Sequence, residues 1–344
     1  MNGTVSTHPQ PSLTTASSPR DLLGVSNLSK RFPVGRGQHL YAVDQLDFSI
    51  GQGESVGLVG ESGCGKSTLI RLITRLLDPS QGEIWFEGTL ISGIPVRQFV
   101  QHPVRAQLQM VFQDPSDSLN PRFTALDTIT EPIKRLTQTR DAQVLRQRAE
   151  ELADWVGLPT ALLSRYPHQL SGGQKARVGI ARAIALNPKL LILDEPTSAL
   201  DVSVQAIILH LLADLKARLG MSYLFVSHDL NVVRLLCDRI MVMYLGKIVE
   251  TGPAEQIFNH PQHPYTQALI TAIPSFEAKP KPIALAGEPR SPIDPDAKVC
   301  RLYGRCAQAT ERCQQESPVL RAIAHDHSVA CHYPLSESAG VPSM

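Results

Sequence analysis

Apolar positions along the chain form short continuous runs and longer periodic segments, which alternate from Leu22 to about Glu250. The run at 56–59 predicts a strand, and apolar residues three and four positions apart over 69–76 predict a helix after it. A second continuous run, 190–193, has the pattern of a strand buried on both faces of a parallel sheet. This alternation predicts an α/β fold built from strand–helix units.

The two ends of the chain differ from this middle part. Residues 1–20 are polar and rich in Ser, Thr and Pro, a composition typical of a flexible N-terminal segment. After Gly252 proline becomes frequent and few long periodic runs remain. We therefore expect a main domain over 21–255 and a C-terminal extension over 256–344.

Composition narrows the class of protein. Hydrophobic residues make up 42% of the chain and charged residues 19%, so a packed core is expected. Lys and Arg number 33 against 32 for Asp and Glu, and this balance argues against nucleic acid as a partner. No apolar run approaches the ~18 residues that span a bilayer, and the N-terminus lacks signal-peptide features. We expect a cytosolic protein with reduced thiols.

The stretch GESGCGKST, 60–68, matches the pattern G-x-x-x-x-G-K-[ST] between the predicted strand and helix. Its glycines let the backbone wrap closely around phosphate oxygens, and N–H groups at the helix N-terminus bind the anion. Lys66 is predicted to reach the β- and γ-phosphates, and the Ser67 hydroxyl to hold Mg²⁺. The predicted nucleotide contacts here are Gly60, Glu61, Ser62, Gly63, Cys64, Gly65, Lys66, Ser67 and Thr68.

Two acidic residues follow the second apolar run. Asp194 and Glu195 stand at the carboxyl end of the predicted strand, where ligands bind in such sheets. Asp194 is predicted to complete the Mg²⁺ shell, and Glu195 to orient and deprotonate the attacking water. A helix N-cap would explain the same acidic pair without catalysis.

The stretch LSGGQ, 170–174, predicts a second helix N-terminus suited to phosphate. Ser171 and Gln174 match a capping box, and the two glycines between them leave N–H groups exposed. One nucleotide does not need two phosphate-binding helix N-termini on the same face. A second copy of the domain is therefore expected to supply this one.

These motifs, with Gln113 in MVFQDP, SALD at 198–201 and His228 in FVSHD, occur in an order that resembles the nucleotide-binding subunit of an ABC transporter over about 22–252. The resemblance implies a P-loop NTPase core with a RecA-like mixed sheet, an antiparallel β subdomain and a helical subdomain at about 114–175. It also implies a sandwich dimer in which ATP lies between Lys66 of one subunit and Ser171 of the other.

The resemblance assigns further roles. Glu195, His228 and Lys66 become the catalytic residues, with His228 holding the γ-phosphate and the attacking water. Gln113 joins Ser67 and Asp194 around Mg²⁺ and links to the membrane subunits. The residues that would serve the ATP across the dimer are Ser171, Gly172, Gly173, Gln174 and Asp201.

The family also stacks adenine on an aromatic residue upstream of the phosphate loop. Phe32 fits that position best and Tyr41 is its rival. Core packing is the alternative explanation for either ring.

The tail continues the resemblance. IFNHPQHPYTQALITAIP, 257–274, and GEPRSPIDP, 287–295, are similar to the C-terminal extension of oligopeptide/dipeptide importer ATPases. Four cysteines follow, and they lack the tight C-x₂₋₄-C pairs of structural zinc. The subfamily pattern implies a [4Fe–4S] cluster on Cys300, Cys306, Cys313 and Cys331, with zinc or unliganded thiols as alternatives. Cys64 and Cys237 are not candidates, since one lies in the phosphate loop and the other in an apolar helical stretch.

The resemblance implies an ATP-hydrolysing subunit that powers peptide import from the cytoplasmic face of the plasma membrane. Its expected partners are two membrane-spanning permease subunits, a second ABC ATPase subunit and, indirectly, a substrate-binding protein. An importer ATPase for glutathione or a nickel complex is an alternative. A soluble ABC ATPase of DNA repair or translation is disfavoured, because no heptad run separates Lys66 from Ser171 and the chain has one cassette. A non-hydrolysing regulatory subunit would be expected to lack Glu195 or another motif.

Overall fold

The computed structural model describes residues 21–273 and 285–335. The expected flexible segment 1–20 and residue 274 lie outside the described residues. A four-stranded antiparallel sheet has the order β2-β1-β4-β5. Its strands are β1 (Asp21–Gly35), β2 (Gln38–Gly51), β4 (Gln81–Phe86) and β5 (Thr89–Leu90).

The second sheet is mixed and has eight strands in the order β11-β12-β10-β9-β3-β8-β7-β6. Strands β6, β7, β8, β3 and β9 run parallel, and β10, β12 and β11 continue the sheet antiparallel. Their bounds are β3 (Ser55–Val59), β6 (Leu108–Val111), β7 (Leu190–Asp194), β8 (Ser222–Val226), β9 (Arg239–Tyr244), β10 (Lys247–Pro253), β11 (Arg321–Ala324) and β12 (His327–Val329). The predicted combination of a mixed sheet and an antiparallel sheet is confirmed.

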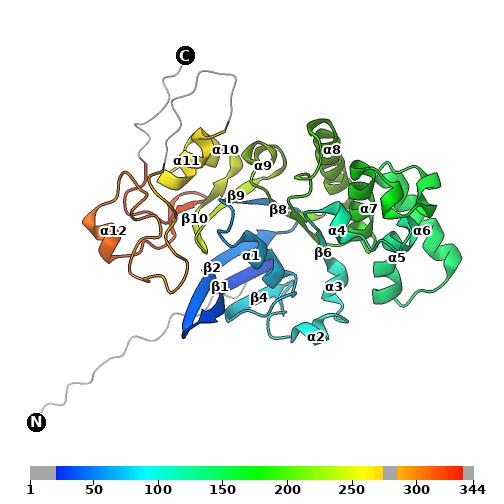
Figure 1. The fold of residues 1–344 in the computed structure, drawn as a ribbon, viewed down its shortest axis with the longest axis horizontal. Coiled ribbons are helices and arrows are strands. Elements are labelled where there is room, and N and C mark those ends of the chain that lie inside the picture. Colours follow the sequence, from blue (N-terminus) through cyan, green and yellow to red (C-terminus); the bar gives the residue numbers. More distant parts are fainter. Residues whose placement is uncertain (1–20, 274–284, 336–344) are drawn as a thin grey trace, which may run out of the picture.

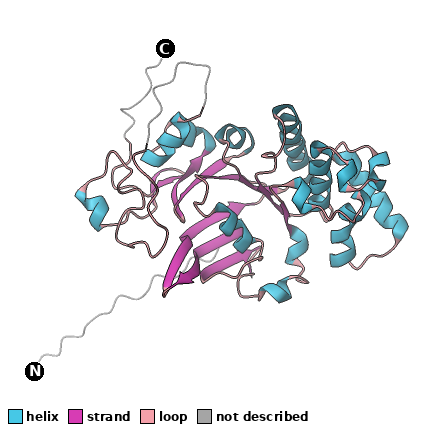
Figure 2. Ribbon diagram, in the orientation of Figure 1, coloured by secondary structure: helices cyan, strands magenta, loops and turns pink. Residues whose placement is uncertain are grey.

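Helices α5, α6 and α7 gather at one end of the molecule, and α12 lies at the opposite end (Figures 1 and 2). The helices are α1 (Lys66–Ile73), α2 (Val96–Phe99), α3 (Val104–Gln107), α4 (Pro115–Ser118), α5 (Ala125–Leu136), α6 (Ala142–Trp155), α7 (Gly172–Ile184), α8 (Val202–Leu219), α9 (Leu230–Leu236), α10 (Ala254–Asn259), α11 (Pro264–Thr271) and α12 (Glu311–Gln315), with short 3₁₀ turns at Thr160–Ser164 and Pro167–Gln169.

Two apolar cores explain why the central strands are continuously hydrophobic. One core packs the antiparallel sheet and α1 against one face of the mixed sheet, and it contains Ile192. The other packs helices against the opposite face, and it contains Leu191 and Leu193. Successive residues of a strand point to opposite faces, so a strand covered on both sides must be apolar throughout. The predicted strand at 190–193 is confirmed as β7.

The helix after the phosphate loop ends earlier than its periodicity predicted. It stops at Ile73, and Leu76 is exposed instead of continuing the apolar face. The Thr74 hydroxyl donates to the Ile70 carbonyl at 2.7 Å, and Arg75 adopts a left-handed φ of 56°. A residue in that conformation ends an α-helix.

The C-terminal extension contributes strands β11 and β12 to the mixed sheet, where Glu250 of β10 pairs with Val329. The Glu250 side chain is fully buried. It accepts hydrogen bonds from the backbone N–H of Gln262 (2.7 Å) and of His263 (3.0 Å), and its Oε1 lies 2.8 Å from Nε2 of His327. A buried carboxylate is tolerated only when so many donors satisfy it, so these contacts fix the extension on the core.

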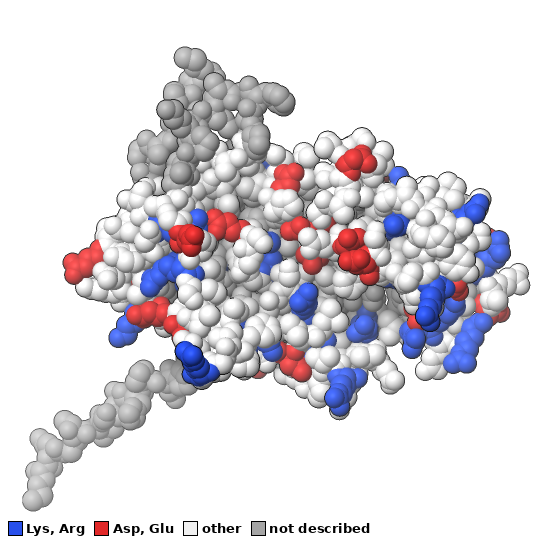
Figure 3. All heavy atoms as spheres, in the orientation of Figure 1, with Lys and Arg blue, Asp and Glu red and all other residues white. Residues whose placement is uncertain are grey.

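Within 21–273 and 285–335, none of the helices is both long and apolar enough to cross a lipid bilayer. On the face drawn in Figure 3, basic and acidic side chains lie interspersed.

Candidate nucleotide site

The phosphate loop connects β3 to α1 and depends on glycine for its shape. Gly60 has a φ of 153° and Gly65 a φ of 112°. A Cβ atom on Gly60 would collide with the carbonyl oxygen of Met243, and one on Gly65 with that of Ala42. The loop therefore packs against neighbouring backbone at positions where only glycine fits.

Lys66 lies inside the loop and is almost completely buried. Its Nζ donates hydrogen bonds to the carbonyl oxygens of Gly60 (2.7 Å) and Glu61 (3.0 Å). The adjacent Cys64 is buried too, and this burial raises the pKa of its thiol. The ammonium of Lys66 is the positive charge of the loop, whereas Cys64 is a packed, protonated thiol.

Two residues of the C-terminal extension hold the loop from outside. The Glu61 backbone N–H donates to the Tyr265 hydroxyl oxygen at 2.8 Å. The Arg305 guanidinium lies 3.1 Å from the Glu61 carboxylate and also donates to the Tyr244 hydroxyl at 3.1 Å. These partners are 204 and 244 positions from Glu61 along the chain, and no local pattern indicated them.

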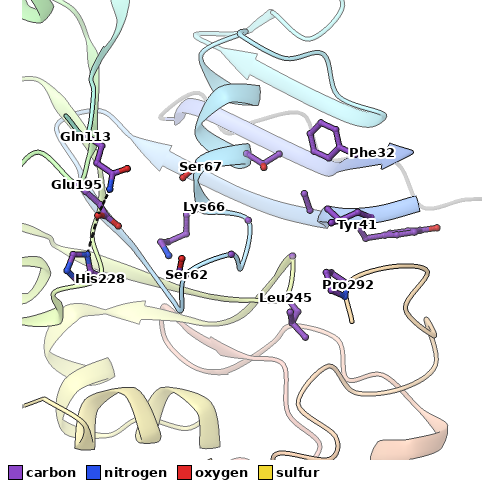
Figure 4. A pocket seen from close by; sticks show the side chains of 16 residues that line it. Phe32, Tyr41, Ser62, Lys66, Ser67, Gln113, Glu195, His228, Leu245 and Pro292 are labelled. Carbon is purple, nitrogen blue, oxygen red and sulfur yellow. Dashed lines mark hydrogen bonds and ion pairs between the residues drawn. The ribbon is translucent and has the colours of Figure 1, made fainter. Parts of the chain in front are cut away.

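Three polar side chains, those of Gln113, Glu195 and His228, lie together at one end of a pocket that the phosphate loop also lines (Figure 4). Glu195 Oε2 accepts a hydrogen bond from Gln113 Nε2 at 3.1 Å and lies 3.2 Å from His228 Nδ1. Glu195 has a left-handed φ of 45°, which is uncommon for a residue with a side chain and occurs at functional sites. Its backbone N–H donates to the Val226 carbonyl at 2.9 Å, so the end of β8 fixes this conformation.

Asp194 ends β7, directly before Glu195, and is buried. Burial, with a contribution from the Glu195 carboxylate, raises the pKa of Asp194 to about 6. The positive charges of Arg71 and Lys66 oppose that rise. A cation placed nearby would favour the ionised form further.

The pocket has a volume of about 500 Å³, within the range of small-molecule sites. It is lined by Phe32, Leu40, Tyr41, Ala42, Ser62, Gly63, Gly65, Lys66, Ser67, Thr68, Gln113, Glu195, His228, Leu245, Gly246 and Pro292. Gly60, Glu61, Cys64 and Asp194 support these residues but do not line the pocket. The lining residues that were not predicted are Leu40, Ala42, Leu245, Gly246 and Pro292, of which Pro292 belongs to the extension.

Both candidate aromatic rings line the pocket, at the end away from Glu195 (Figure 4). The Lys30 ammonium lies 5.2 Å from the centre of the Phe32 ring, and the Arg31 guanidinium lies 4.7 Å from that of Tyr41. Since each ring has a cation over one face, each could offer only its other face to a base. The arrangement leaves Phe32 and Tyr41 as alternatives.

The LSGGQ stretch begins α7 as predicted. The Ser171 N–H donates to Gln174 Oε1 at 2.9 Å, and the Gln174 N–H donates to Ser171 Oγ at 3.3 Å, which confirms the capping box. Ser171, Gly172, Gly173 and Gln174 do not line the pocket described above. Asp201 does not line it either, and caps α8 by accepting the Val204 N–H at 3.0 Å.

The four cysteines of the tail share one small pocket. Burial raises the pKa of Cys300, Cys306 and Cys331, that of Cys331 to about 11. All four thiols are free of disulfides. No group of three or more His, Cys, Asp or Glu within the described ranges has the spacing for a metal ion.

Comparisons with known proteins agree with this geometry. Residues 43–198 match the model of the ABC transporter family, and residues 249–313 match that of the oligopeptide/dipeptide transporter C-terminal region. The chain is 43% identical to the oligopeptide transport ATP-binding protein AppF of Bacillus subtilis, over 92% of this chain and 99% of that protein. It is 41% identical to the dipeptide transport ATP-binding protein DppF of Haemophilus influenzae, over 91% and 96% respectively.

Among solved structures, the ATP-binding cassette MJ0796, a dimer bound to ADP and Pi, has a TM-score of 0.62 and 31% identity. The match covers 67% of this chain and 98% of that one. One conclusion follows from the fold, from the phosphate loop and acidic residues that meet at the pocket, and from these relatives. The chain belongs to the ABC transporter family, as an ATP-binding protein that carries the oligopeptide/dipeptide transporter C-terminal region.

Proposed function

We propose that this chain hydrolyses ATP to power peptide import through an ABC transporter, bound peripherally to the membrane. The observation that carries the hydrolytic part is the convergence of Gln113, Glu195 and His228 on the pocket beside the phosphate loop. The matched C-terminal region and the names of the relatives support peptides as the transported class. The alternative is that the transporter imports glutathione or a nickel complex, and a transport assay distinguishes these substrates from peptides.

In the proposed mechanism, Lys66 and the N–H groups at the start of α1 bind the β- and γ-phosphates. Glu195 orients the attacking water and accepts its proton, and His228 holds the water and the γ-phosphate. When bound together with ATP, Mg²⁺ would offset phosphate charge. Ser67, Gln113 and Asp194 would suit that ion because they offer oxygen ligands, and a nearby cation would lower the raised pKa of the buried Asp194 carboxyl.

The LSGGQ stretch supports a dimer in this proposal. Ser171 and the first residues of α7 do not line the chain's own pocket, so a second ATPase subunit would bring its copy to this ATP. The partners proposed beyond that subunit are two permeases and a substrate-binding protein. We propose the division into 21–255 and 256–344 as the functional one, with the helical subdomain near 114–175 presenting LSGGQ.

We also propose that Cys300, Cys306, Cys313 and Cys331 hold a [4Fe–4S] cluster. The four thiols line one shared pocket, and cysteine thiolates are the ligands that such a cluster takes. Protonated thiols would release protons on binding. Protein purified without oxygen should contain iron and sulfide and absorb at about 400 nm. Colourless, iron-free protein would refute the cluster, and zinc in its place would show the alternative.

The transport function is tested in a strain that lacks the chain's gene. Uptake of a labelled tripeptide should return with the wild-type chain and not with Glu195→Gln. Labelled glutathione and Ni²⁺ serve as parallel substrates. Restored uptake of one of these, with no peptide uptake, would replace the proposed substrate while leaving the ATPase assignment intact.

A further inference from the structure

A short segment of the C-terminal extension lies along strand β2, beside the nucleotide pocket. The Tyr41 N–H donates to the Pro292 carbonyl at 2.9 Å, and the Asp294 N–H donates to the His39 carbonyl at 2.9 Å. Leu40 and Ile293 form an isolated antiparallel bridge. Residues about 250 positions apart are thus paired by backbone hydrogen bonds, which hold independently of the side chains.

A buried ion pair fixes the chain just beyond this segment. The Arg301 guanidinium lies 2.6 Å from the Asp44 carboxylate, and both side chains are nearly inaccessible to solvent. Lys247 lies 3.2 Å from the same carboxylate. Strand β2, the turn after β9 and the extension are therefore joined at one point. The chain is thus held at Pro292–Asp294 and again at Arg301.

Pro292 lines the same pocket as the two candidate aromatic rings. Figure 4 shows Phe32 and Tyr41 on one side of this end, with Leu245 and Pro292 across from them. Glu195, Gln113 and His228 lie at the other end, and Lys66 between the two. A nucleotide whose phosphates contact Lys66 and whose reacting end faces Glu195 must direct its base toward Pro292.

We propose that Pro292 packs against the base of the bound nucleotide, so that the C-terminal extension supplies the outer wall of the base site. The proposal deepens the proposed ATPase function and rests on it. A proline ring is an apolar surface with no hydrogen-bonding group of its own, and Leu245 beside it is apolar too. This wall stabilises any planar base by contact and does not distinguish adenine from guanine by hydrogen bonds.

The test measures Mg²⁺-dependent binding to the full chain by calorimetry, with ATP, GTP and tripolyphosphate as ligands. In Pro292→Ala the affinity for both nucleotides should fall about three- to tenfold, because apolar contact with the base is lost. Tripolyphosphate has no base, so its affinity should stay within about twofold. Pro289→Ala is the matched control, because Pro289 is exposed and does not line the pocket. It should bind all three ligands as the wild type does.

The outcomes distinguish a failure of the proposed Pro292 contact from a failure of the nucleotide site itself. Unchanged nucleotide affinity in Pro292→Ala, or an equal loss for tripolyphosphate, overturns the base wall. A wild-type chain that binds neither ATP nor tripolyphosphate would overturn the nucleotide site itself. Photolabelling of the wild type with 8-azido-ATP does not depend on any variant folding. The label should appear on the peptide that contains Pro292, and label confined to β1 and β2 would contradict the proposal.

Discussion

His263 should make the stability of this protein sensitive to mild acid. Its side chain is almost fully buried at the start of α11, where Nδ1 accepts the Tyr265 N–H at 3.1 Å. Only a ring that is unprotonated at Nδ1 can accept that bond. Burial lowers the pKa of His263 to about 4, against the opposing influence of Glu250.

The size of the stability loss in acid follows from this lowered pKa. A histidine in the unfolded chain has a pKa of about 6.5, so between that value and about 4 protons bind the unfolded state preferentially. The stabilisation is therefore complete above about pH 6.5 and is lost as the pH falls toward 4. Linkage puts the loss at pH 5 at about 2 kcal/mol, out of roughly 3 kcal/mol in total.

The assay is urea denaturation of the full chain at pH 8 and pH 5, followed by circular dichroism. The matched variant is His263→Asn, because asparagine can accept the same capping hydrogen bond and does not titrate. Other titrating groups are common to both proteins and cancel in the comparison. Between the two pH values, the wild type should lose about 2 kcal/mol more than the variant. Parallel pH dependences would refute the reasoning.

Two further substitutions test the phosphate loop. Arg305→Ala removes the charged partner of Glu61, so the affinity for MgATP should fall about fivefold in a calorimetric titration, which is about 1 kcal/mol. Wild-type affinity in that variant would show that the ion pair does not hold the loop. Gly65→Ala should abolish MgATP binding and lower the unfolding free energy by about 1–3 kcal/mol, because the new Cβ meets the Ala42 carbonyl. Gly53 also has a positive φ, but a Cβ added there would meet no atom within 4 Å, so Gly53→Ala should retain MgATP binding. If Gly53→Ala and Gly65→Ala bind MgATP equally, the steric argument is contradicted.

Features encoded over a few residues were predictable from the sequence. The strand–loop–helix at 55–73 and the capping box of Ser171 and Gln174 depend on local spacing, and the structure contains both. The early end of α1 was not predicted, because a side-chain hydrogen bond from Thr74 overrides the apolar period.

The contacts of the extension with the site could not be predicted in the same way. Arg305 reaches Glu61, and Pro292 reaches the pocket, only because the chain returns along β2 after more than 200 residues. Pro292 lies in the stretch GEPRSPIDP and Arg305 between Cys300 and Cys306, but neither stretch indicates which part of the core it contacts. The proline-rich composition of 287–295 indicated irregular backbone but not what that backbone covers.

The rate of ATP hydrolysis by Glu195→Gln tests the central claim most directly. The variant keeps the size and the hydrogen-bonding capacity of the side chain but cannot accept a proton from water. It should bind ATP, trap a closed dimer and turn over at least about a hundredfold more slowly than the wild type. Near-normal hydrolysis by this variant would contradict the assignment of Glu195 as the catalytic base.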